Sequence, residues 1–182
     1  IMNMKKIISF FIVACCAMCA TAAKVVWQIG VADNSGTELA LGPSEYKKFL
    51  AHDFGYEDRY FLVGTSVDKN DFPYVLPGPD DTWGGTWSTS GWRTHDANIL
   101  FGIKKLPKHG KWKLVVDLVD ANPSRSVVKV MVNSAEKKFE IKGHSKGVLE
   151  GNLQDAKEQI LEFPISADDL KKGGNMVTVS VL

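Results

Sequence analysis

Short runs of alternating apolar and polar residues, repeated along most of the chain, constrain its fold more than any other feature. Alternation with a period of two is the pattern of a half-buried β-strand. The clearest run, over residues 111–119, puts four apolar side chains on one face: Trp112, Leu114, Val116 and Leu118. The pattern predicts strands over Val25–Ile29, Tyr60–Thr65, Asn98–Lys104, Lys111–Val119, Val127–Asn133, Lys138–Lys142, Gln159–Ile165 and Met176–Leu182.

Clusters of Pro, Gly, Asn and Asp separate these runs, as at 106–110 and 120–124. Many short strands separated by frequent turns are typical of a β-sandwich or jelly roll, so we predict an all-β jelly-roll sandwich. One short helix is expected between Ser44, a good N-cap residue, and Gly55, a good helix terminator. Residues 166–175 are expected to connect two strands through about one helical turn.

The first residues have the organisation of an export signal. Lys5 and Lys6 precede an apolar run over 7–14, and small residues follow up to Ala22. A charged, an apolar and a small-residue region in this order predict a secretory signal peptide over 1–23. The apolar run is shorter than the roughly 20 residues that a membrane span needs, so none is expected. We therefore expect a secreted or periplasmic protein with one domain over 24–182.

The positions of the cysteines and the net charge argue against disulfides in the processed domain and against a nucleic-acid partner. Cys15, Cys16 and Cys19 all lie within 1–23, so the processed domain would depend on its core and not on disulfides. A lipoprotein anchor at Cys15 is an alternative interpretation of the same segment. Removal of Lys5 and Lys6 from the 22 basic residues leaves one fewer than the 21 acidic residues. Without a basic stripe, a nucleic-acid partner is not expected.

Three tryptophans, Trp83, Trp87 and Trp92, fall within a polar, glycine-rich stretch that has no hydrophobic period. Indole faces bring a large contact area at low cost in conformational entropy, and they suit the apolar faces of sugar rings. Asp81, Arg93 and His95 lie in or beside this stretch and could bond hydroxyl groups or a carboxylate. The alternative is that the indoles cap one end of the sandwich. We predict a carbohydrate-binding site here and no catalytic residue.

The residues Trp27–Leu39, with the sequence WQIGVADNSGTEL, resemble the opening of the jelly-roll accessory domain of rhamnogalacturonan lyases, polysaccharide lyase family four. Later stretches fit the same domain, and together they cover nearly all of residues 24–182: Tyr60–Ser66, Asp71–Tyr74, Ile99–Ile103, Val130–Asn133, Phe163–Ile165 and Leu170–Asn175. The resemblance implies a galactose-binding-like fold and an accessory role in the degradation of pectin-type polysaccharide. The final alternation, which stops at Leu182 without a turn, further suggests a fragment whose parent continues.

An oxygen-rich loop follows the first predicted strand and includes Asp33, Asn34 and Glu38. Oxygen ligands of this kind suit calcium. The jelly-roll carbohydrate modules that the chain resembles often hold a structural calcium near this corner. The competing interpretation is an Asx turn, with Glu38 as a surface residue. No other cofactor is expected.

Two functional hypotheses follow. The first is a non-catalytic module that binds a polysaccharide or oligosaccharide for a downstream catalytic domain of the same chain, a lyase or a glycoside hydrolase. The second is a structural domain that packs on that catalytic domain and completes its cleft. A third interpretation, that the fragment is itself a lyase, lacks a convergent acid–base pair in the sequence.

Overall fold

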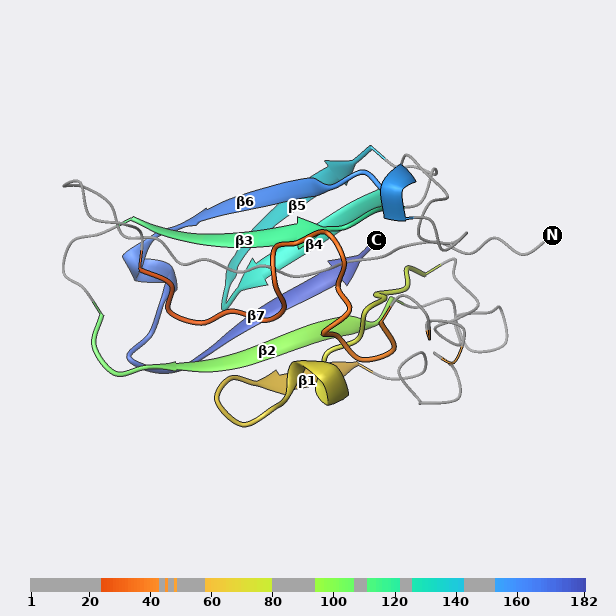
Figure 1. Cartoon of the computed structure of the whole chain (residues 1–182). Helices are drawn as coiled ribbons and strands as arrows, with labels where there is room; N and C mark the ends of the chain where they lie inside the picture. Colours follow the sequence, from red (N-terminus) through yellow and green to blue (C-terminus); the bar gives the residue numbers. More distant parts are fainter. Residues whose placement is uncertain are drawn as a thin grey trace.

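The computed structural model describes residues 24–42, 45, 48, 58–79, 94–106, 111–121, 126–142 and 153–182. Within them, strands form two sheets, which are the two layers of Figure 1. The first sheet has five strands, in the spatial order β1 (Arg59–Leu62), β2 (Asp96–Ile103), β7 (Gly173–Val181), β4 (Ser126–Val132) and β5 (Ala135–Ile141). The second sheet pairs β3 (Trp112–Leu118) with β6 (Gln159–Ile165). The predicted all-β sandwich is confirmed.

β7 is the central strand of the larger sheet. It pairs antiparallel with β2 on one side, where Val177 lies opposite Ile99, and with β4 on the other, where Val177 lies opposite Val132. β4 continues into β5 as an antiparallel hairpin, whereas β1 pairs with β2 in parallel. The last strand in the sequence therefore joins the two halves of this sheet.

The core lies between the two sheets and is built from the alternating residues. On β3 the predicted inward face is confirmed, because Trp112, Leu114, Val116 and Leu118 are all buried. They face side chains of the larger sheet that are also buried, among them Ile99, Phe101, Val128, Val130, Val177 and Val179. Valine and isoleucine dominate this list because β-branched side chains pack well on a pleated surface.

The prediction of a strand over Val25–Ile29 is wrong, because this segment enters no ladder in the structure. Its side chains instead pack against the core. The Trp27 ring packs against Phe101 with centroids 5.2 Å apart, and Ile29 is fully buried. Trp27 and Trp112 of β3 line a void of about 20 Å³, the size of one water molecule. The segment fills the gap between the two sheets. This insertion, and not strand pairing, explains why its side chains alternate between buried and exposed positions.

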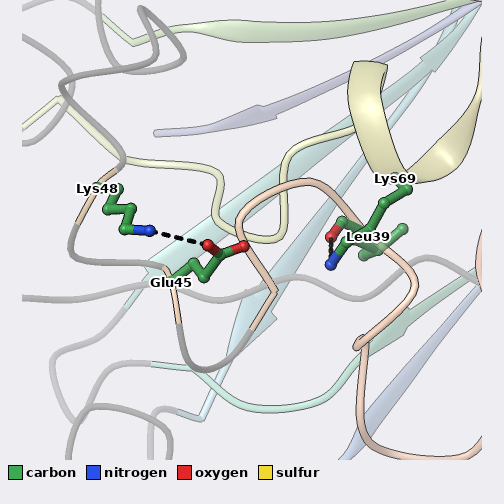
Figure 2. A network of polar contacts seen from close by, with 4 residues as sticks. All are labelled: Leu39, Glu45, Lys48 and Lys69. Carbon is green, nitrogen blue, oxygen red and sulfur yellow. Dashed lines mark hydrogen bonds and ion pairs between the residues drawn. The ribbon is translucent and has the colours of Figure 1, made fainter.

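The loop that follows is tied to a short helix that the sequence did not reveal, α1 (Asp68–Asp71). Lys69 Nζ donates to the carbonyl oxygens of Thr37 at 3.0 Å and Leu39 at 3.2 Å, and Figure 2 shows its side chain reaching Leu39. Ala40 bridges Pro73 next to these contacts. The helix therefore holds the loop against the sandwich.

The helix predicted between Ser44 and Gly55 lies outside the described residues except for Glu45 and Lys48, whose side chains form an ion pair at 3.0 Å (Figure 2). The predicted turn in the connector is present as the 3-10 helix η5 (Ala167–Asp169), which Ser166 caps. A second 3-10 helix, η4, spans Leu153–Asp155.

Several strand limits differ from the predicted ones. β1 ends at Leu62 instead of Thr65, because the N–H groups of Thr65 and Ser66 fold back onto the Leu62 carbonyl oxygen. β5 begins earlier than predicted, directly after a two-residue turn in which Asn133 has a φ of 53°. β7 also begins earlier, at Gly173, since the glycines that suggested a connector pair with β2.

Candidate functional site

Five residues of the predicted carbohydrate site, Asp81, Trp83, Trp87, Trp92 and Arg93, lie outside the described residues. The chain leaves the described part at Pro79 and returns at Thr94. On the return, Thr94 Oγ1 donates to the Val181 carbonyl oxygen. Asp96 N donates to Asp58 Oδ1 at 3.0 Å. The segment that carries the tryptophans therefore returns to the sandwich beside the end of β7.

His95, the sixth residue of that prediction, directly precedes β2 and is only 3% exposed. Its neighbour Asp96 accepts a hydrogen bond from Ser180 Oγ at 2.5 Å. These contacts fix the first residues of β2 against β7. His95 therefore lies next to the residues that attach the tryptophan segment to the sheet, and its side chain is almost completely buried there.

The oxygen-rich loop is closed by its own hydrogen bonds. Asp33 Oδ1 accepts from both the backbone N–H and the hydroxyl of Ser35, at 3.0 and 2.8 Å, which is an Asx turn. Asn34 follows with a φ of 59°, and Glu38 Oε1 accepts from Val31 N at 2.6 Å. Among the described residues, no three His, Cys, Asp or Glu side chains gather as metal ligands would. The calcium site at Asp33, Asn34 and Glu38 stays a prediction.

A different feature, which the sequence reasoning missed, lies on the outer face of the larger sheet. The alternation that sends Ile99, Phe101 and Val177 into the core turns Leu100 and Met176 outward, where they lie opposite each other. Leu62 of β1 pairs with Leu100 from the other side. Leu62 is 47% and Met176 38% exposed, so an apolar row crosses three strands in contact with solvent.

This apolar row borders an open hollow, which we call the glycine trough: Leu62, Leu100, Gly102, Gly174 and Met176 line one part, and Gly102, Lys104, Lys172 and Gly173 the other. The two parts measure about 410 and 550 Å³. Gly102 on β2 lies directly opposite Gly174 on β7. A glycine within a strand weakens the strand and often marks a close approach of a ligand or of another backbone. Gly102 in the middle of a predicted strand was the signal that could have revealed the trough.

The turn before β7 is held rigidly at the edge of the trough. Asn175, only 4% exposed, accepts from Lys171 N at 2.7 Å and donates to the carbonyl oxygens of Lys171 at 2.8 Å and Gly173 at 3.1 Å. Its Oδ1 also accepts from Asn133 Nδ2 at 2.9 Å. One buried amide thus fixes the backbone on both sides of Lys172.

A buried carboxyl group lies elsewhere, on β3. Asp117 is 5% exposed, and its Oδ1 has no hydrogen-bond partner in the described part of the chain. Burial, together with smaller effects of charge repulsion and a hydrogen bond from the neighbouring Glu158, raises the pKa of Asp117 from 3.8 to about 6. This carboxyl group therefore influences the stability of the sandwich near neutral pH.

None of the helices described in the structure is both long and apolar enough to cross a membrane. A comparison with curated proteins returns no match. A comparison with family models matches residues 25–182 to the CBM-like domain III of polysaccharide lyase family 4. The match covers most of the chain and agrees with the β-sandwich and with the resemblance of its opening residues. The chain belongs to this family of CBM-like domains.

Proposed function

We propose that this domain is an exported accessory module that binds polysaccharide for a catalytic domain of the same protein. The observation that carries the proposal is the match of residues 25–182 to a CBM-like domain of a polysaccharide lyase family. A CBM-like domain is named for its likeness to carbohydrate-binding modules, and the rigid β-sandwich found here is a suitable platform for such a surface. The signal-like residues 1–23 support the proposed export.

The tryptophan segment is the proposed contact with the sugar. Trp83, Trp87 and Trp92 would stack on pyranose rings, while Asp81 and Arg93 bond hydroxyl groups or, through Arg93, a uronate carboxylate. The anchoring of Thr94 and Asp96 to the sheet supports this proposal, because a ligand loop on a rigid scaffold loses less entropy on binding. Buried His95 would act by holding this anchor in place.

The proposed ligand is a pectin-type plant polysaccharide, and the proposed parent is a polysaccharide lyase or a glycoside hydrolase. Support comes from the lyase family to which the domain belongs. The chemistry would reside in another domain, so the module would raise the local concentration of substrate without itself breaking a bond.

The test is retention of the purified chain in native gels that contain pectic polysaccharide. The double variant Trp87→Ala/Trp92→Ala should lose most of the retention, because two stacking faces disappear. Ile160→Ala removes an apolar side chain that is 56% exposed on β6 of the other sheet, and it should migrate like the original chain.

Unchanged retention in the tryptophan variant would refute this placement of the site. If the original chain is not retained by any glycan, while the same tryptophan changes inactivate the longer parent, the domain instead completes the cleft of its catalytic partner.

A further inference from the structure

We propose that the glycine trough is a second saccharide site and that it takes an acidic, uronate-bearing oligosaccharide. The inference rests on the proposed carbohydrate-binding function but concerns different residues. The tryptophan segment joins β2 at its first residue, Asp96, whereas the trough lies at its last residues, around Gly102. These two points are separated by about 20 Å of extended strand. The strand ends that border the trough, where β2 ends and β7 begins, lie at the left of Figure 1.

The shape of the trough suits a flat ring. A Cβ atom added at Gly102 or at Gly174 would meet no atom within 4 Å, so the paired backbones form a bare floor. The exposed side chains of Leu62 and Met176 stand beside this floor and offer an apolar surface. A pyranose ring has an apolar C–H face and a polar edge, so it can cover these side chains while its substituents point along the floor.

The positively charged lysines that line the trough favour an anionic ligand. Ile103, the last residue of β2, lies opposite Gly173, the first residue of β7. Lys104 directly follows β2, Lys172 directly precedes β7, and both line the hollow. Lys105 and Lys171 are their exposed neighbours. Like charges that border one hollow repel each other. Among the described residues, neither Lys104 nor Lys172 has an ion-pair or hydrogen-bond partner. A bound anion would relieve this repulsion.

The acidic residues near this edge do not neutralise the lysines. Asp168 and Asp169 on η5 are the closest in sequence, and Asp169 Oδ2 is already occupied by Ser166 N at 2.8 Å. Asn175 meanwhile fixes the carbonyl oxygens of Lys171 and Gly173, which flank Lys172. Because the backbone is ordered before binding, the lysine loses less entropy when it meets an anion.

Two saccharide anions share this chemistry, the carboxylate of a uronate and a sulfate ester. The trough favours the uronate, because its carboxylate is attached directly to the ring. The charge can then reach the lysines while the ring stays over the glycine floor.

The experiment measures binding by titration calorimetry of the purified chain at low ionic strength. The probes are an oligogalacturonide, its fully methyl-esterified form, which is neutral, and a sulfated galactan oligosaccharide. The variants are Gly102→Val, which fills the floor, and Lys104→Gln/Lys172→Gln, which removes the charges. Lys138→Gln on β5, at the far edge of the same sheet, is the matched control. Valine is well suited to a strand, and space is open at Gly102, so Gly102→Val should still fold.

We expect the lysine variant to bind the oligogalacturonide about tenfold more weakly, as befits the loss of two charge contacts. Gly102→Val should weaken binding by a similar factor, and Lys138→Gln should not. Added salt should weaken the binding of the original chain more than that of the lysine variant, which keeps only the proposed Arg93 contact with a uronate. The methyl ester should bind the original chain no better than it binds the lysine variant.

Oligogalacturonide binding that is unchanged in both trough variants would overturn this site, while the tryptophan site would stand. Sulfated galactan binding that is as tight as uronate binding, and is lost in the same variants, would overturn the choice of uronate. Failure of the original chain to bind any saccharide would instead reject the carbohydrate-binding function itself, together with the trough. Should Gly102→Val not fold, the lysine variant and the salt dependence decide the outcome.

Discussion

Trp27 shows how one side chain can define the edge of a sandwich. It lies on a segment that pairs with no strand, yet its ring meets Phe101 of β2 at 5.2 Å and borders the same void as Trp112 of β3. An aromatic ring in this place bridges the two sheets and keeps water from the core.

Replacement of Trp27 by alanine should lower the free energy of unfolding by about 2–4 kcal/mol, because it opens the void between the sheets. Trp27→Phe should cost less, since part of the contact with Phe101 remains. Urea unfolding followed by circular dichroism measures both. Equal stability of Trp27→Ala and the original chain would show that the segment does not close the core.

Asp117 makes stability depend on pH. Its pKa is about 6 in the folded chain against 3.8 in the unfolded chain, so the folded state holds the proton more tightly. The stabilisation is complete below about pH 4 and is lost as the pH rises through 6, by at most about 3 kcal/mol.

Asp117→Asn removes this ionisation, so the stability difference between the variant and the original chain should shift in favour of the variant from pH 4 to pH 7.5. Urea unfolding at several pH values measures the difference. Asp168→Asn, on the exposed helix η5, controls for the loss of one negative charge. A difference that does not change with pH would contradict the raised pKa.

At the scale of the elements, the side chains of two asparagines hold the β4–β5 hairpin and the start of β7 in place. Asn133 tolerates its φ of 53° because asparagine adopts left-handed conformations more readily than most residues. Its side chain bonds Asn175 and the Asp169 carbonyl oxygen, at 2.9 and 2.7 Å, and so joins the hairpin turn to β7 and η5.

Asn175→Ala should cost about 2–3 kcal/mol, because it removes several buried hydrogen bonds at once. Amide exchange at Lys171 should also accelerate, since its N–H loses the Asn175 acceptor. Ser134→Ala, at an exposed position of the same hairpin, should change neither quantity. Slow exchange at Lys171 in the Asn175 variant would contradict this role.

The sequence allowed good predictions of those elements whose burial follows a simple period. The predicted bounds agree to within two residues for β2, β3, β4 and β6. In each of these strands, alternate side chains point into the core between the sheets. Val25–Ile29 alternates as well, but it does so by inserting Trp27 and Ile29 between the sheets, and periodicity does not reveal pairing. α1 was missed because its four residues, Asp68–Asp71, are all polar or charged and bury no apolar face.

The site was harder to predict than the fold. Stacking aromatics are conspicuous in a sequence, so Trp83, Trp87 and Trp92 drew the prediction, and they stay a prediction. The glycine trough depends on register, which brings Gly102 opposite Gly174 and places Lys104 and Lys172 on the lining of one hollow, from positions some seventy residues apart. Gly102 alone could point to a hollow, but no local pattern reveals which residue lies opposite it.

At the scale of the whole molecule, β7 decides whether a sandwich exists. It lies between β2 and β4 and supplies Val177, Val179 and Val181 to the core. Without it, β4 and β5 would have no ladder to β1 and β2.

Deletion of residues 175–182 should therefore abolish cooperative unfolding, and not merely reduce stability. Calorimetry of the shortened chain would show no heat-absorption peak, and its proton spectrum would lose the dispersion of a folded β protein. A sharp thermal transition in the shortened chain would show that the five-stranded sheet forms without its centre.

The whole account depends on saccharide binding at the tryptophan segment and at the glycine trough. The most direct measurement is an NMR titration of the isotope-labelled chain with an oligogalacturonide. We predict saturable shift changes that cluster at residues 80–96, including the three indole N–H signals, and separately at Gly102 and Lys172–Gly174. A spectrum that stays unchanged at millimolar oligosaccharide, or changes confined to β3 and β6, would contradict it.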